Sequence, residues 1–161
     1  MICAIMSNGD ELSLKNKNEK DKPYPLIKLQ IRNVIWELYC NGYDEFYLNC
    51  EYGVQLWSAE IICAFKLYNS IKLHILIPYE EQAVNWCEEY RDRYYKVHLN
   101  ADNVCLINTH YHYKCYAEVD EIMISKSDLL LVFGEKNNKS YLSEHIVKNN
   151  VQMIYYKLDF D

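Results

Sequence analysis

"LNCEYGVQLWSAE", residues 48–60, joins the end of an apolar strand, a turn around Gly53 and the start of an amphipathic helix. In parallel α/β proteins this junction points the N–H groups of a helix N-terminus towards a bound anion. Glycine suits the turn because it reaches positive φ without strain and lets a ligand approach the backbone. Glu51 places a carboxylate where an anion would sit, so this acid decides what the junction can bind.

The rest of the chain repeats this alternation of β-rich runs and helical patterns. Strands are expected at residues 2–6, 45–50, 72–78, 104–109, 129–133 and 153–158. Helices are expected at residues 27–38, 54–68, 117–128 and 140–150. A further helix, third in chain order, is expected where Ala83, Trp86, Tyr90 and Tyr94 would form its apolar face. Strands that alternate with helices pair in parallel through right-handed crossovers. The sequence therefore predicts an α/β fold with a Rossmann-like, doubly wound, mainly parallel sheet in a three-layer α/β/α sandwich. Residues 1–161 form one domain in this interpretation, with Trp57 and Trp86 largely buried.

Composition excludes several classes of partner. The formal net charge is -6 and no long basic block is present, which argues against a nucleic-acid partner. No apolar run approaches the roughly 20 residues of a membrane span, so no membrane partner is expected. Seven scattered cysteines are typical of reduced, buried thiols and predict a cytoplasmic protein. The 16 tyrosines are assigned to packing, and the lysine-rich residues 13–22 to a solvated loop.

The sequence contains one cluster of possible metal ligands and one cluster of acidic residues, and neither predicts a functional site. His110, His112 and Cys115 stand close together but lack a fourth ligand at suitable spacing, so neither a metal nor another cofactor is predicted. Glu118, Asp120 and Glu121 are expected on a solvated helix face.

The fold class places the ligand crevice at the carboxyl ends of the strands, where the strand order reverses. Five loops follow predicted strands and are the candidates to line it: residues 7–10, 49–53, 78–82, 109–112 and 134–140.

Four segments, "YGVQLWSAE", "ILIPYEEQAVNW", "YRDRYYKVHLNADNV" and "SKSDLLLVF", occur in an order and spacing that resemble the YpsA-type branch of the SLOG superfamily. That branch is Rossmann-like and related to DprA and to the Lonely Guy phosphoribohydrolases. The resemblance is strongest at residues 53–60 and in the spacing of Pro78, Gln82 and Trp86. It implies a nucleotide or nucleotide-derived ligand bound over the strand ends. The predicted ligand-binding residues are Ser7, Asn8, Gly9, Asn49, Cys50, Glu51, Tyr52, Gly53, Gln55, Pro78, Tyr79, Gln82, His110, Lys139 and Ser140.

This chain departs from the family pattern at the turns. Residues 49–52 replace a turn rich in small residues, Met6 and Asn8 replace a glycine and a basic residue, and "GEKNNKS" contains no glycine-rich phosphate loop. Glu51 then suits ribose hydroxyls or an adenine amino group better than a phosphate, or it caps the following helix. Lys139 and Ser140 are the phosphate candidates, although Ser140 can equally be a plain helix N-cap.

Three functions remain open. The first is non-catalytic binding of a small nucleotide-derived ligand, an ADP-ribose-like or cyclic nucleotide signal, by a sensor or sequestering protein. The second is hydrolysis of a nucleotide N-glycosidic bond, with Glu144 as a candidate acid but without the family's catalytic motif, so no catalytic residue is assigned. The third is a protein-interaction module with a vestigial crevice, forming a homodimer or higher homo-oligomer through the tyrosine-rich third helix.

Overall fold

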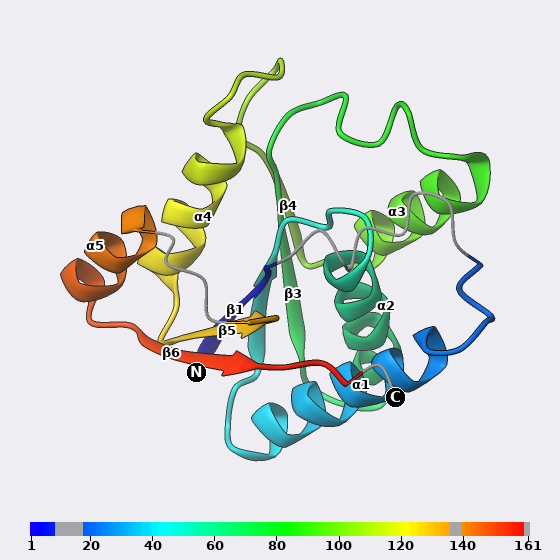
Figure 1. The fold of residues 1–161 in the computed structure, drawn as a ribbon, viewed down its shortest axis with the longest axis horizontal. Coiled ribbons are helices and arrows are strands. Elements are labelled where there is room, and N and C mark those ends of the chain that lie inside the picture. Colours follow the sequence, from blue (N-terminus) through cyan, green and yellow to red (C-terminus); the bar gives the residue numbers. More distant parts are fainter. Residues whose placement is uncertain (9–17, 136–139, 160–161) are drawn as a thin grey trace.

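A computed structural model describes residues 1–8, 18–135 and 140–159. Within these residues, six strands alternate with five helices (Figure 1). The elements are β1 (Ile2–Ser7), α1 (Tyr24–Cys40), β2 (Glu45–Leu48), α2 (Val54–Lys66), β3 (Lys72–Ile77), α3 (Glu88–Asn100), β4 (Asn103–Leu106), α4 (Cys115–Lys126), β5 (Leu129–Phe133), α5 (Ser140–Asn149) and β6 (Gln152–Tyr156).

The strands form one sheet in the order β4-β3-β2-β1-β5-β6, and every neighbouring pair is parallel. Cys3 of β1 lies opposite Phe46 of β2 on one side and Leu129 of β5 on the other. The chain runs outward from β1 to β4 and then returns to the other side of β1, so the strand order reverses between β1 and β5. This is the predicted doubly wound α/β fold.

Helices cover both faces of the sheet (Figure 1). Because successive strand residues point to opposite faces, Cys3 and Ile5 pack into a core with α1, α2 and α3, whereas Ala4 and Met6 pack against α4 and α5. Trp57 of α2 is only 1% exposed, which confirms its predicted burial. The three layers are therefore built by one alternating pattern along β1.

The third helix was predicted too early in the chain. It begins at Glu88, and the stretch before it is a series of turns in which the N–H groups of Gln82 and Trp86 donate to the carbonyls of Tyr79 and Ala83. Successive turns of this kind repeat every three residues and so imitate the spacing of a helix. Trp86 is half-buried in these turns rather than on a helix.

The cysteines differ from the prediction of buried thiols. All seven lie within the described residues and are free, but Cys40, Cys87 and Cys105 are exposed. Cys105 belongs to the edge strand β4 and Cys87 precedes α3, so neither position is covered by a layer of the sandwich.

No helix in the described ranges is long and apolar enough to cross a membrane.

Candidate functional site

The site begins where β1 and β2 separate. Their paired register ends at Ala4 and Tyr47, and beyond this point the side chain of Gln55 bridges the two strands. Its Nε2 donates to the Ile5 carbonyl at 2.6 Å, and its Oε1 accepts from the Asn49 N–H at 3.3 Å. Gln55 is 2% exposed and thus satisfies two main-chain groups that the sheet no longer pairs. The Gln55 side-chain amide therefore connects the separated ends of β1 and β2 through two hydrogen bonds.

The turn after β2 is held in an uncommon backbone conformation. Cys50 has φ 54° and Gly53, the N-cap of α2, has φ 97°. Asn49 Oδ1 accepts from the Glu51 N–H at 2.9 Å, and the Leu56 N–H donates to the Glu51 carbonyl at 3.0 Å. A left-handed residue other than glycine persists only where its surroundings fix it. These bonds fix the direction in which the turn presents its side chains.

A small cavity of about 210 Å³ opens at this turn, and we name it the acidic cavity. It is lined by Met6, Ser7, Asn49, Glu51, Gln55, Tyr116 and Asp120. Two of these residues, Glu51 and Asp120, carry carboxyl groups, and none of the described residues that line the cavity is a lysine or an arginine. Burial, and then the charge of Glu51, raise the pKa of Tyr116, so its phenol stays protonated at neutral pH and can donate a hydrogen bond. Such a lining suits a neutral group rich in hydroxyls or amino groups better than a phosphate.

A larger pocket of about 560 Å³ borders the same turn at Tyr52, and we name it the aromatic pocket. It is lined by Tyr52, Tyr79, Gln82, Asn85, Trp86, Cys87 and Tyr90. Tyr52 meets Tyr90 and Trp86 edge-on, with ring centroids 4.5 and 5.6 Å apart. Burial, and then a hydrogen bond with Tyr90, raise the pKa of Tyr52, which therefore remains a neutral phenol. The pocket offers several aromatic faces to a planar group.

Gln82 connects the aromatic pocket to the turn. Its Nε2 donates to the Asn49 carbonyl at 3.1 Å, and its Oε1 accepts from the Tyr94 hydroxyl at 3.1 Å. Tyr79 lies 6.2 Å from Tyr116, centroid to centroid, and so links the linings of the two cavities. The acidic cavity and the aromatic pocket are neighbouring parts of one surface.

The structure brings together seven of the predicted site residues. Ser7, Asn49, Glu51 and Gln55 line the acidic cavity, and Tyr52, Tyr79 and Gln82 line the aromatic pocket. This juxtaposition of Ser7 with Asn49 follows the prediction that the turns after β1 and β2 meet.

The other predicted residues have different environments. Cys50 is fully buried in the core, and burial raises the pKa of its thiol well above the usual value. Asn8 is buried and donates its N–H to the Phe133 carbonyl at 2.8 Å, Pro78 accepts from Asn108 Nδ2 at 3.1 Å, and His110 is exposed beside Glu81. Gly9 and Lys139 lie outside the described residues, as does the side chain of Ser140 at the start of α5.

Tyr116 and Asp120 were missed by the sequence interpretation. Asp120 was expected on a solvated face, but it is 7% exposed and lines the acidic cavity. The spacing of four places both side chains on one face of α4, next to the apolar stripe of Val119 and Met123. That continuity with an apolar stripe was the signal that could have identified them. Glu144 is exposed on α5 and belongs to neither lining.

The strand-order reversal itself is tightly packed. Gly134 follows β5 with φ 125°, and a Cβ there would lie 2.3 Å from the Asn8 carbonyl oxygen. The backbones after β1 and β5 therefore touch, and the acidic cavity opens on the β2 side of β1 instead.

Glu19 forms hydrogen bonds with residues of three helices, α1, α2 and α3. Its side chain is 10% exposed and accepts from Trp57 Nε1 and Arg93 Nη1, each at 3.0 Å, and from Lys28. Arg93 also donates to both oxygens of Glu60 at 2.6 and 2.7 Å. Burial alone would raise the pKa of Glu19, but the hydrogen bonds from Lys28 and Trp57 and the charge of Arg93 lower it. Residues 13–22 were expected to be solvated, and Glu19 departs from that expectation because these partners enclose it.

Candidate metal ligands have other partners. His112 Nε2 lies 3.0 Å from Asn108 Oδ1, and the His112 N–H donates to Cys115 Sγ at 3.1 Å. In the part of the chain that the structure describes, no three His, Cys, Asp or Glu side chains are grouped as metal ligands would be.

Comparison with known proteins gives one family. The family model named YpsA, described as the YspA SLOG family, matches residues 10–160. A UPF0398 protein of Halalkalibacterium halodurans is 31% identical over 152 residues, which cover 90% of this chain and 79% of that protein. UPF0398 proteins of Lysinibacillus sphaericus and Brevibacillus brevis are 29% and 28% identical, over 76% of this chain and 71% and 68% of theirs.

Proposed function

Because this chain belongs to the YpsA family of SLOG proteins, we propose that it binds a small nucleotide-derived ligand, without turnover, at the ends of β1 and β2. The ligand class is an ADP-ribose-like or cyclic nucleotide signal, and the protein acts as a cytoplasmic sensor or as a sequestering protein. One observation carries the proposal: an acidic cavity and an aromatic pocket both border a single turn, and Tyr79 and Tyr116 connect their linings.

The two cavities match the two halves of a nucleoside. Glu51 and Asp120 accept hydrogen bonds from the ribose hydroxyls, since carboxylates are the strongest acceptors that a sugar diol can meet. The base enters the aromatic pocket against Tyr52 and Trp86, where stacking contributes about 1–3 kcal/mol per base in other proteins. Because the described residues of the two linings include no lysine or arginine, we propose that phosphates extend outward and that Lys139 and Ser140 meet them.

A thermal-shift screen followed by calorimetry tests this division of the ligand. The probes are adenosine, AMP, ADP-ribose, cyclic AMP and inorganic phosphate. A ligand present at a hundred times its Kd stabilises the native state by about 2.7 kcal/mol, which is roughly 5–10 °C in Tm for a chain of this size. We expect the nucleoside-containing probes to raise Tm and inorganic phosphate to leave it unchanged. A screen in which only phosphate binds would contradict the proposal.

Variants then locate the ligand. Glu51→Gln keeps the size of the side chain but removes its charge, so affinity for the ribose-containing probe should fall about 10- to 100-fold. Tyr52→Ala should weaken the same probe through the base. Glu37→Gln, an exposed acid on α1, is the matched control and should bind as the parent does. Equal affinity in Glu51→Gln and Glu37→Gln would remove the acidic cavity from the site.

Hydrolysis of an N-glycosidic bond is the second candidate, and the pairing of Glu51 with Asp120 in one cavity favours it. One carboxylate can stabilise the positive charge that develops on the sugar while the other activates a water molecule. Release of free base from nucleoside monophosphates, followed by chromatography at high protein concentration, tests this candidate. Turnover that Asp120→Asn abolishes would support hydrolysis, and binding without base release would leave the non-catalytic function.

If no nucleotide-derived probe binds or turns over, the crevice is vestigial and the chain is an interaction module.

A further inference from the structure

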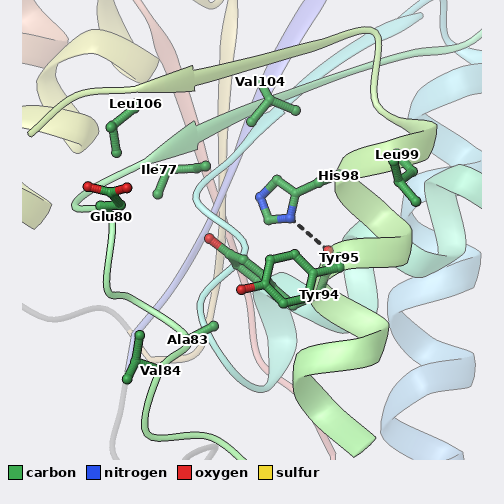
Figure 2. Close-up of a pocket in the computed structure, with 10 residues that line it drawn as sticks. All are labelled: Ile77, Glu80, Ala83, Val84, Tyr94, Tyr95, His98, Leu99, Val104 and Leu106. Carbon is green, nitrogen blue, oxygen red and sulfur yellow. Dashed lines mark hydrogen bonds between the residues drawn. The ribbon is translucent and has the colours of Figure 1, made fainter. Parts of the chain in front are cut away.

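An apolar groove lies away from the candidate site, between α3, β4 and the turns that precede α3 (Figure 2). Its volume is about 450 Å³. The apolar side chains around it that are most exposed are Val84, Tyr95, Leu99, Val104 and Leu106, at 58%, 58%, 86%, 43% and 45%. The lining also includes one acidic residue, Glu80. The largest apolar patch on a soluble protein is often functional, so this surface is a candidate interaction site.

The rim of this groove is a sheet edge. β4 pairs with β3 and stands at the end of the strand order among the described strands. All of its residues, Asn103 to Leu106, are exposed and none carries a charge. Edge strands are normally protected from other chains by lysines, prolines or inward charges. β4 has none of these, and among the described strands it pairs with β3 alone, so one row of its main-chain groups faces away from the sheet.

His98 marks the groove as incomplete. Its Nδ1 lies 2.7 Å from the Tyr94 carbonyl, an interaction drawn in Figure 2, so Nδ1 carries the proton and Nε2 is an acceptor. Nε2 is buried and has no hydrogen-bond partner among the described residues. A buried acceptor without a donor costs about 1–3 kcal/mol, which a covering partner with a donor would recover.

We propose that a second copy of this chain covers the groove, with the two β4 strands pairing antiparallel about a two-fold axis. An antiparallel pair of identical strands is self-complementary, as a closed dimer requires. Val104 and Leu106 of each copy then lie on the same face as the α3 helices, and Tyr95 and Leu99 of the two copies meet across the axis. The two grooves are filled reciprocally.

The lack of charge on β4 and the exposed area favour this occupant. Each chain carries a formal net charge of -6, and β4 adds no charge to the contact, whereas the groove lining contributes the carboxylate of Glu80. A stable dimer buries about 800 Å² on each partner, of which more than half is apolar. The five side chains, which are 43–86% exposed, contribute apolar area to such an interface, and the outward main-chain groups of β4 contribute hydrogen bonds.

Sedimentation equilibrium of the whole chain tests the proposal. The parent should sediment at twice the 19.3 kDa mass of one chain at micromolar concentrations. Val104→Lys with Leu106→Lys places four like charges at the axis and should raise the dissociation constant at least a hundredfold. The matched control is Leu67→Lys with Tyr68→Lys, which changes two residues that are 74% and 89% exposed after α2 and should leave the dimer intact. A parent that stays monomeric up to about 100 μM overturns the proposal and leaves the groove to a different protein.

Hydrogen exchange on the unmodified protein provides an independent check. Amides of residues 103–106 should exchange more slowly at dimeric than at monomeric concentrations, because edge pairing gives them new acceptors. A dimer whose β4 amides exchange at the same rate at both concentrations would place the interface elsewhere and refute β4 pairing.

Discussion

Replacing Gln55 by leucine should destabilise the protein far more than its small change in volume suggests. The substitution leaves the Ile5 carbonyl and the Asn49 N–H without their side-chain partners at a position where Gln55 is 2% and Asn49 6% exposed. Each unsatisfied buried group costs about 1–3 kcal/mol, and the added apolar burial returns roughly 1 kcal/mol. The net loss is then about 3 kcal/mol, or roughly 6–12 °C in Tm for a chain of this length.

Gln30 offers a matched control for this prediction. Its amide makes the same two kinds of bond, donating to the Asp159 carbonyl at 2.8 Å and accepting from the Asp159 N–H at 2.9 Å, but on the exposed surface. Water can replace these bonds, so Gln30→Leu should change stability by less than about 0.5 kcal/mol. Urea denaturation and calorimetry of both variants measure the difference. If Gln55→Leu loses no more stability than Gln30→Leu, the hydrogen bonds of Gln55 do not stabilise the ends of β1 and β2.

Three further perturbations test the structure. Gly134→Ala should lower the free energy of unfolding by at least about 1–3 kcal/mol, because the backbone is strained and the new Cβ meets the Asn8 carbonyl. Calorimetry should show a smaller loss of stability for Gly42→Ala, whose Cβ meets only a side chain at 3.4 Å. The folded pKa of Glu19 is lowered, so the stabilisation from this carboxylate is present above its unfolded pKa of about 4.3 and is lost as pH falls. The free energy of unfolding, measured by urea denaturation between pH 5 and 3, should therefore decrease more steeply with falling pH for the parent than for Glu19→Gln. Equal decreases in the two proteins would contradict this. Burial also lowers the pKa of His98 despite its bond to a carbonyl, so the stabilisation from its neutral form is present above the unfolded pKa of about 6.5 and is lost as pH falls below it. His98→Phe should reduce that loss of unfolding free energy, and an equal or steeper loss in the variant would refute it.

The sequence alone was sufficient to predict the layers and the location of the turn. Each strand carries a short apolar run and each helix an apolar stripe, and these periods are properties of neighbouring residues. The pattern "CEYGVQ" likewise identifies a strand-to-helix turn, since only glycine enters φ near 97° cheaply. Membership of the α/β class and the nearness of Ser7 to Asn49 follow from such local signals and from the rule for parallel sheets.

The cavities were decided by tertiary structure. Asp120 looks like one of several surface acids on α4, and it becomes a cavity residue only because α4 packs with that face over the ends of β1 and β2. Gln55 was predicted to bind the ligand, but its bonds to the main chain arise only because two strands diverge and leave groups that its amide can reach. The turns around Ala83 share the three-residue spacing of a helix, so their different backbone is visible only in the fold. Periodicity reports which face of an element is apolar, but the partner that each polar side chain meets depends on contacts between residues far apart in the chain.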